Sequence, residues 1–233
     1  NSFPIKTNGT LWCTGTNVEG QTGLGLPGGL VDDFTQVGTD TNWDQIAAGV
    51  YHVLGLKTNG KLWGWGASHF GRLGINGSGD QYYRTPQAIQ STLNFKAIAA
   101  GWDNSSVIRA DGTLYAGGSN AYGKLGIGSN DATTSNSNFA QVGTSSNWAS
   151  IPTRSGEFNS GAINESAEMS ATGADNYSQL GNYDGTNTNS NSMSQVTCTD
   201  MLGVDDISKN NAVTLYPNPA KDFLYIKFEK SAK

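Results

Sequence analysis

Few residues of this chain have the types and spacing that catalysis or metal binding requires. The sequence contains only two histidines, His52 and His69, whereas a zinc site needs several His or Cys ligands at paired spacings. The carboxylate pairs Asp32-Asp33 and Asp205-Asp206 are adjacent in the sequence, so on an extended chain the two side chains of each pair point to opposite sides. Neither pair is placed for acid–base work on one substrate.

The remaining candidates are acids in polar loops. Asp80, Asp131 and Asp184 could meet a calcium ion, yet none stands in the spacing of a calcium-binding loop. Neither a Gly-x-Ser-x-Gly elbow nor a phosphate-binding glycine loop occurs. The sequence therefore predicts a protein that is not an enzyme and holds no cofactor or metal, although a site assembled from several distant loops would leave no local motif.

Composition narrows the class of protein further. The 233 residues include 31 glycines, only 14% are charged, and the formal net charge is −5. An acidic chain without a basic patch is a poor nucleic-acid binder, and no apolar run is long enough for a membrane span. The chain opens at Asn1, so we expect any signal peptide to lie outside this sequence. Two cysteines, Cys13 and Cys198, predict isolated residues rather than a disulfide framework.

The elements that would position any site belong to an internal repeat. The turn dipeptides Asn8-Gly9, Asn59-Gly60 and Asp111-Gly112 recur at intervals of 51 and 52 residues. A second motif keeps the same phase, because Trp43–Gly49 returns as Phe95–Gly101. Repetition at this period indicates an array of similar units that bury their apolar faces against their neighbours.

One unit reads as four short strands. In residues 43–89 we expect strands at Trp43–Ala48, Val53–Thr58, Lys61–Trp65 and Pro86–Ile89. Asn59-Gly60 predicts a type I′ turn, and Pro86 is expected to begin an outer edge strand. Four strands per unit and no helical period describe an all-β chain of four-stranded antiparallel β-propeller blades.

The other units vary on this pattern. Residues 1–49 lack the opening strand, residues 95–142 are complete, and in the fourth unit Ser166-Ala167 replaces the turn dipeptide. The predicted repeats are 1–49, 50–101, 102–154 and 155–200, followed by a linker at 201–212 and a separate segment at 213–233. Aromatic residues recur at two strand positions and predict core packing between blades: Trp12, Trp63 and Tyr115, and Trp43, Phe95 and Trp148.

The unit resembles the regulator of chromosome condensation repeat. The matching residues are Ala48-Gly49, His52, Asn59-Gly60, Leu62–Gly66 and Gly71–Gly74. The resemblance covers residues 1–196 and is most specific in the two middle units; kelch repeats are the nearest rival. Propellers of this family usually have seven blades, so the resemblance implies that the visible units are part of a larger ring. It also implies a structural hydrogen-bonding role for His52, at a position we assign to Asn104 and Glu157 in the next two units.

A second resemblance lies at the other end of the chain. Residues Val213–Ile226, with Tyr216-Pro217-Asn218-Pro219, look like the opening of a type A sorting domain of the bacterial type IX secretion system. The resemblance implies export to the cell surface or the medium, with the secretion machinery as a partner. Only about the first half of such a domain is visible, which predicts a chain truncated at both ends.

These resemblances lead to three functional hypotheses. The first is a secreted or cell-surface binding module that holds a protein or glycan partner and catalyses nothing. The founder of the repeat family suggests the second, an exchange-factor-like regulator of a small GTPase; the third is a glycan-degrading propeller enzyme. Loops on one face carry partner binding in such propellers, and the candidates here are Val50, Tyr51, Trp102 and Asp103.

Overall fold

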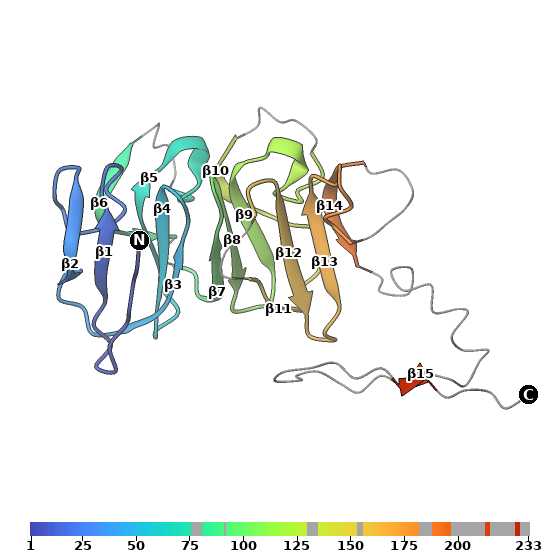
Figure 1. The fold of residues 1–233 in the computed structure, drawn as a ribbon, viewed down its shortest axis with the longest axis horizontal. Coiled ribbons are helices and arrows are strands. Elements are labelled where there is room, and N and C mark those ends of the chain that lie inside the picture. Colours follow the sequence, from blue (N-terminus) through green and yellow to red (C-terminus); the bar gives the residue numbers. More distant parts are fainter. Residues whose placement is uncertain are drawn as a thin grey trace, which may run out of the picture.

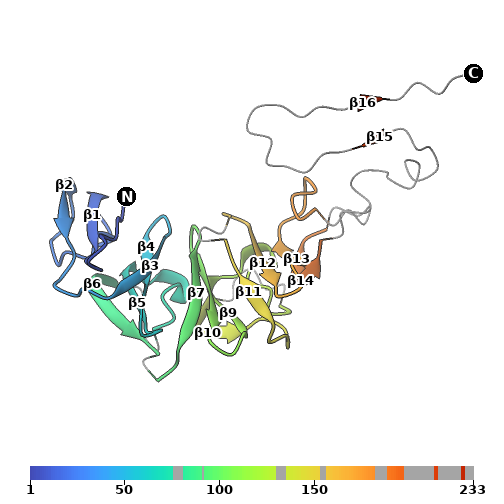
Figure 2. The ribbon, with the colours of Figure 1, turned by 90° about the horizontal axis from the view of Figure 1, so that it is seen from below.

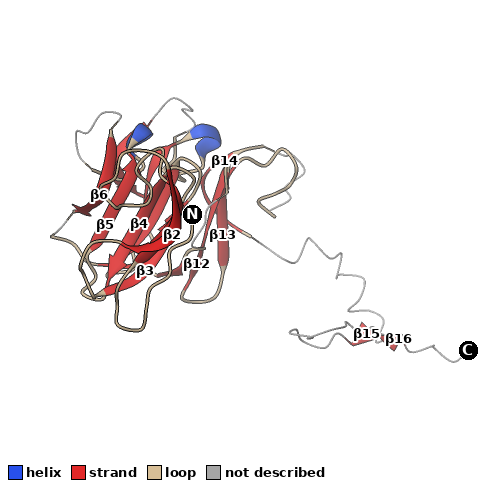
Figure 3. Cartoon of the chain, turned by 60° about the vertical axis from the view of Figure 1, so that its left-hand side comes forward, coloured by secondary structure: helices blue, strands red, loops and turns tan. Residues whose placement is uncertain are grey.

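The chain folds into successive antiparallel β-sheets that stand side by side. The computed structural model describes residues 1–75, 81–90, 92–129, 135–152, 156–181 and 188–196, with two short strands beyond them. The sheets follow one another along the long axis of the molecule (Figure 1), and the view from below shows the same series (Figure 2). Helical structure in these residues is confined to two 3-10 turns, drawn in blue in Figure 3.

We call the sheets blades I to IV. Blade II contains β3 (Trp43–Ala48), β4 (His52–Lys57), β5 (Leu62–Ala67) and β6 (Tyr82–Ile89), in that order across the sheet. Blade III contains β7 (Phe95–Ala100), β8 (Asn104–Arg109), β9 (Leu114–Ser119) and β10 (Ser135–Gln141). Blade IV contains β11 (Trp148–Ser150), β12 (Asn159–Asn164), β13 (Met169–Gly173) and β14 (Ser190–Gln195). The predicted four-stranded antiparallel blades are confirmed, including the degraded fourth one.

Blade I has a different strand content. It pairs β1 (Trp12–Thr16) with β2 (Leu30–Gln36), and residues 2 and 5 form single bridges to residues 14 and 11. The first residues thus run beside β1, in the place where the other blades have their second strand. No described strand of this blade corresponds to β3, as the sequence predicted.

The hairpin turn at Asn59-Gly60 differs from the predicted type I′ turn. Gly60 has a φ of 75°, but Asn59 is not among the residues with positive φ. The N–H of Gly60 donates to the carbonyl of Lys57 at 2.8 Å, and the N–H of Lys57 donates to the carbonyl of Lys61 at 3.0 Å. This is a three-residue loop in which only the glycine is left-handed. The type I′ prediction was wrong because the loop is one residue longer.

The edge strand β6 also differs from its prediction. It starts at Tyr82, and Pro86 lies inside it rather than at its beginning. The ladder to β5 pairs Gly64 with Gln87 and Gly66 with Tyr83, so its register shifts between these pairs. Pro86 lies within this irregular stretch of an edge strand, where its missing N–H removes no regular ladder bond.

Apolar clusters join the blades to one another. One cluster combines Leu54 and Leu62 of blade II with Phe95 and Ile98 of blade III. Burying a large apolar side chain contributes about 1.5–3 kcal/mol. The predicted core positions Trp43, Phe95 and Trp148 are confirmed as buried. Trp12, Trp63 and Tyr115 are only half-buried, and a cationic side chain lies over each ring. Trp63 and Tyr115 also pack against the apolar clusters that join the blades.

A buried polar ladder runs between the blades. His52 Nε2 lies 2.7 Å from Ser105 Oγ, and Asn104 Nδ2 donates to Ser160 Oγ at 3.3 Å. Burial, and secondarily the charge of Arg72, lowers the pKa of His52 to about 3, so the imidazole is neutral. The scaffold role expected for His52 is confirmed.

The strand register corrects one sequence equivalence. His52 pairs with Gly66, Asn104 with Gly118, and Asn159 with Gly173. Asn159, not Glu157, is therefore the counterpart of His52 in blade IV. The connection from β11 to β12 is longer than in the other blades, which displaced the alignment by two residues.

Several sequence predictions fall outside the described residues. These are Cys198, the linker at 201–212, the motif at 216–219, and the acids Asp80, Asp131, Asp184, Asp205 and Asp206. In the segment 213–233, β15 (Val213–Thr214) pairs antiparallel with β16 (Lys227–Phe228). The repeat boundaries stay predictions.

Two kinds of feature are absent from the described part of the chain. It contains no group of three or more His, Cys, Asp or Glu side chains placed to hold a metal ion. None of its helices has the length and apolar character to cross a membrane.

Cys13 is buried, and burial raises the pKa of its thiol to about 11.

Candidate partner-binding face

Loops from three blades gather at one end of the sheets. They are residues 49–51 before β4, residues 101–103 before β8 and residues 156–158 before β12. Two 3-10 turns, η1 (His69–Gly71) after β5 and η2 (Ala121–Gly123) after β9, lie at the same end because the strands are antiparallel. Figure 1 shows this end along the upper edge. We call it the loop face.

The structure brings two of the predicted site residues together. Tyr51 of blade II and Trp102 of blade III meet edge to face, with ring centroids 6.4 Å apart. Trp102 is 41% exposed, whereas Tyr51 is half-buried. The guanidinium carbon of Arg72 lies 5.5 Å from the ring centre of Tyr51 and 5.6 Å from that of Phe70. One cation thus links the rings of Tyr51 and Phe70.

The other two predicted residues are tied into the scaffold. Asp103 is half-buried and forms an ion pair with Lys124, whose side chain is only 2% exposed. Lys124 Nζ also donates to the carbonyl of Glu157 at 3.0 Å, which connects blade III to blade IV. Val50 is half-buried, and its N–H donates to the carbonyl of Gly101 at 3.3 Å. Val50 and Asp103 position the loops; a direct contact with a partner stays a prediction for both.

Sequence reasoning missed a second aromatic pair on this face. Tyr122 and Phe158 are both exposed, and their ring centroids lie 5.2 Å apart in an edge-to-face arrangement. Phe70 is exposed as well and holds in blade II the position of Tyr122 in blade III. The signal was present, because Phe70 and Tyr122 immediately precede the motifs Gly-Arg-Leu-Gly and Gly-Lys-Leu-Gly. Together with Tyr51 and Trp102 these three aromatics form a row across blades II to IV, which we call the aromatic row.

Two members of the aromatic row have strained backbones. Phe70 has a φ of 60° and Tyr122 a φ of 62°, a region that costs a bulky L-residue about 1–2 kcal/mol. Such strain persists only where the surrounding structure enforces it, and it is concentrated at functional sites. The strain here turns a large apolar ring toward solvent twice, at equivalent positions of two blades.

The sequence matches a known repeat family. Residues 43–72 and residues 59–108 match two models of the Regulator of chromosome condensation (RCC1) repeat. The chain is 32% identical over 127 residues to the ultraviolet-B receptor UVR8 of Arabidopsis thaliana, a match that covers 53% of this chain and 28% of the receptor. It is 30% identical over 134 residues to the probable E3 ubiquitin-protein ligase HERC4 of Homo sapiens, covering 54% of this chain and 12% of the ligase. The matches thus span less than a third of these relatives.

Solved structures show the same fold. Prp20p from Saccharomyces cerevisiae, whose structure was determined with its binding properties to Gsp1p and histones, superposes with a TM-score of 0.73 at 17% identity over 91% of this chain. Human WBSCR16 gives a TM-score of 0.70 at 22% identity over 84% of this chain. Each match covers 50% of the other chain. Residues 43–108 therefore match the regulator of chromosome condensation repeat, and the described sheets share the β-propeller fold of these solved structures.

Proposed function

We propose that this chain is a non-catalytic binding module that holds a protein partner on its loop face. The observation that carries the proposal is the aromatic row, in which Trp102, Phe70 and Tyr122 are exposed from neighbouring blades. Interface hot spots are enriched in Trp, Tyr and Arg held in fixed positions. Here the Tyr51–Trp102 and Tyr122–Phe158 contacts hold the rings before any partner arrives.

Similarity to solved structures supports a protein as the partner class. Prp20p was studied for its binding to Gsp1p and histones, and a second structure holds Kap60 bound to yeast RCC1 (Prp20). The formal net charge of −5 disfavours nucleic acid as the alternative. Fold similarity and the acidic net charge therefore both favour a protein as the partner.

Export is a separate part of the proposal. We propose that the protein acts at the cell surface or outside the cell, on the resemblance of residues 213–226 to a type IX sorting domain. Fractionation of bacteria that produce the protein from its complete gene should recover it from the surface or the medium. Recovery from the cytoplasmic fraction alone would contradict this location.

Alanine substitutions in the aromatic row test the binding face. Surface extracts are passed over immobilised wild-type protein, the captured partner is identified, and its affinity is then measured by calorimetry. We expect Trp102→Ala to weaken that affinity at least about tenfold, and Tyr51→Ala to act similarly, because truncating a hot spot costs about 2 kcal/mol. Phe34→Ala is the matched control, since Phe34 is an exposed aromatic on β2 outside the loop face. Equal affinity of all four proteins would reject the loop face as the interface.

An exchange-factor-like role is the alternative that similarity to Prp20p favours. It predicts that adding the protein accelerates release of a fluorescent nucleotide from a small GTPase. If the protein accelerates nucleotide release and Trp102→Ala does not, we would conclude that the protein is a regulator of the GTPase and that it uses the loop face. Unchanged release leaves the binding function as proposed.

A further inference from the structure

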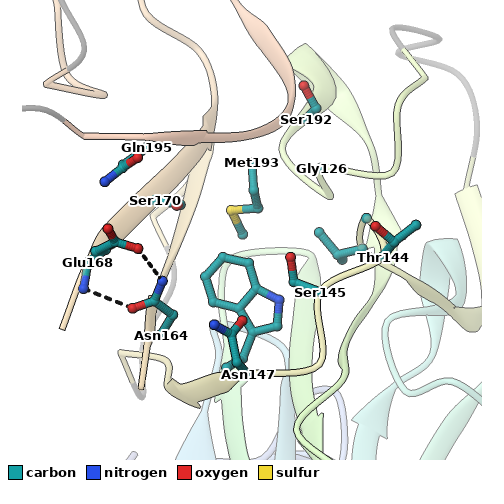
Figure 4. Close-up of a pocket in the computed structure, with 13 residues that line it drawn as sticks. Gly126, Thr144, Ser145, Asn147, Asn164, Glu168, Ser170, Ser192, Met193 and Gln195 are labelled. Atoms are coloured by element: carbon teal, nitrogen blue, oxygen red, sulfur yellow. Dashed lines mark hydrogen bonds between the residues drawn. The ribbon is translucent and has the colours of Figure 1, made fainter. Parts of the chain in front are cut away.

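A cavity of about 350 Å³ lies between blades III and IV (Figure 4). One wall is the connection from β10 to β11, and the other is formed by β12, β13 and β14. The ring of Trp148 also lines it, and Asn164, Glu168 and Ser170 lie on the blade IV side. These last three residues flank the turn between β12 and β13, at the opposite end of the blade from the loop face. The cavity is therefore separate from the aromatic row.

The other blades explain why the cavity exists. In each of the first three blades a cation from the end of the second strand lies over an aromatic ring at the start of the third. The pairs and their distances to the ring centre are Lys6 over Trp12 at 3.6 Å, Lys57 over Trp63 at 3.9 Å, and Arg109 over Tyr115 at 3.6 Å. In blade IV the equivalent residues are Asn164 and Ser170. The strand pairing fixes this equivalence. In each of blades II to IV, the residue before the cation position pairs with the residue before the ring position: Leu56↔Leu62, Ile108↔Leu114 and Ile163↔Met169.

Both replacement residues line the cavity. Asn164 and Ser170 are much shorter than the cation and the ring that they replace, and no described side chain fills the difference. The cavity thus lies where the other three blades have an aromatic ring, an indole in two and a phenol in one, with its cationic cover. The shorter side chains make fewer packing contacts across this blade interface, and a bound ligand can supply such contacts.

The indole of Trp148 lacks a partner in this space. Trp148 is only 6% exposed, and within the described residues its Nε1–H makes no hydrogen bond. Trp43, its counterpart in blade II, also leaves its N–H unpaired there, but the ring of Trp63 packs against it edge to face at 6.3 Å. An unpaired buried donor costs about 1–3 kcal/mol. The Nε1 atom is covered by protein atoms when the cavity holds no ligand, so a ligand oxygen would accept this hydrogen bond once the indole turns slightly toward the cavity.

The lining selects the chemistry of the ligand. Amides, hydroxyls and the carboxylate of Glu168 offer both donors and acceptors, whereas the described wall contains neither Lys nor Arg, which disfavours anions. The carboxylate is held in place, since Asn164 Nδ2 donates to Glu168 Oε2 at 2.6 Å and the Glu168 N–H donates to Asn164 Oδ1 at 3.0 Å (dashed in Figure 4). Trp148 and Met193 add an apolar surface.

We propose that this cavity binds a neutral sugar ring. A pyranose is close in size to the phenol ring that blade III has at this place. It offers hydroxyl groups to Glu168, Asn164 and the Trp148 N–H, and an apolar C–H face to Met193. The proposal does not depend on the proposed protein partner, because the two sites share no residue. The chain would then bind a sugar between blades III and IV and a protein partner on its loop face.

Refilling the cavity is the sharpest test. Saturation-transfer NMR and calorimetry are run with glucose, galactose, mannose and N-acetylglucosamine on the full chain. The double variant Asn164→Lys, Ser170→Trp places in blade IV the pair that occupies blade II, so we expect it to lose sugar binding while its melting temperature stays the same or rises. Trp148→Phe keeps an aromatic ring and removes the donor, and we expect about a tenfold weaker affinity. Glu165→Gln is the control, as Glu165 is an exposed turn residue outside the cavity wall and should not change binding.

Several outcomes would overturn the proposal. One is the absence of saturation transfer to every sugar at about 10 mM, the weak end of specific binding. Another is a double variant that binds sugar as well as the wild type, or, where that variant does not fold, an unchanged affinity in Trp148→Phe. Phenylethylammonium imitates the missing ring and cation; its binding without any sugar binding would reassign the cavity to a cationic side chain of a partner. None of these outcomes bears on the loop face, which is tested with Trp102→Ala.

Discussion

His52 shows how a single buried side chain sets the response of the blades to pH. Its pKa is about 3 in the folded chain and 6.5 in an exposed histidine, because burial disfavours the charged imidazole. Between these two pH values the unfolded chain binds a proton that the folded chain does not. The free energy of unfolding therefore decreases as the pH falls from 6.5 toward 3, by at most about 1.4 kcal/mol per pH unit from this group.

We expect His52→Asn to remove most of this pH dependence. Asparagine occupies the equivalent positions at Asn104 and Asn159 and can keep a hydrogen bond to Ser105. The free energy of unfolding, measured with denaturant at about pH 7, 5.5 and 4.5, should fall less steeply in the variant than in the wild type. Identical slopes would show that His52 is not the titrating group.

Ala167 is a residue whose backbone conformation suits glycine better. Its φ is 63°, and its N–H donates to the carbonyl of Asn164 at 3.0 Å, as Gly60 does to Lys57 in blade II. Ala167→Gly should raise the free energy of unfolding by about 0.5–1 kcal/mol, because relief of left-handed strain exceeds the added chain entropy. Gly60→Ala is the reverse substitution and should lower it by a similar amount. A loss of stability in Ala167→Gly, measured by denaturant unfolding, would refute the strain.

At the scale of elements, we expect the buried ion pair of blade III to contribute more to stability than the more exposed pair at the start of blade II. Lys124 is buried against Asp103 and the carbonyl of Glu157. Lys57 is also buried and pairs at 2.8 Å with Asp40, but the Asp40 side chain is 51% exposed and the Lys57 ammonium has a second partner in the ring of Trp63. Lys124→Met should lower the free energy of unfolding by about 2–4 kcal/mol, since it leaves a half-buried carboxylate unpaired. Asp40→Asn should cost about 1 kcal/mol or less. Equal effects in thermal denaturation would contradict this ranking.

The sequence predicted strands well where the signals were local. Trp43–Ala48 appears as predicted, because its apolar pattern and the following glycine lie within a few residues. Pro86 was misplaced because the register shift of β6 depends on its partner strand. Asn159 was missed as the counterpart of His52 because only the ladder to Gly173 identifies it.

The candidate sites show the same division. The loops carrying Tyr51 and Trp102 were predicted from the resemblance to the repeat family, and the two rings meet across two blades. The exposure of Tyr122 and Phe158 depends on the path of the backbone, which sequence spacing does not give. The cavity arises from two substitutions on different strands, at Asn164 and Ser170, whose combined effect appears only when the blades are superposed.

At the scale of the molecule, the blades form a series in which each contacts its sequence neighbours. Strand β7 of blade III packs on β3 and β4 of blade II, and η2 of blade III packs on β13 and β14 of blade IV. In such an array stability is approximately the sum of blade and interface contributions. Blades II and III have a described neighbour on both sides, whereas blades I and IV have one on a single side.

This arrangement predicts a gradient of amide protection. In native-state hydrogen exchange on the full chain, the amides of β4 and β8 should exchange most slowly, and those of β1 and β13 about tenfold faster or more. The reason is that opening blade I or blade IV breaks one described interface rather than two. Uniform protection of all four strands would indicate that the blades unfold as one cooperative unit.

The polar ladder has a consequence for which blades can be neighbours. Blade III carries both halves of the connection, since Asn104 donates to Ser160 and Ser105 bonds to His52. Blade II carries the first half in His52 but has Val53 where blade III has Ser105. A duplicated blade III could therefore be spliced in after itself with every rung intact, whereas a duplicated blade II would leave a buried imidazole facing a methyl group. The residues at the positions of Asn104 and Ser105 therefore restrict which blades can be neighbours. Blade III is the blade that could be duplicated to lengthen the array.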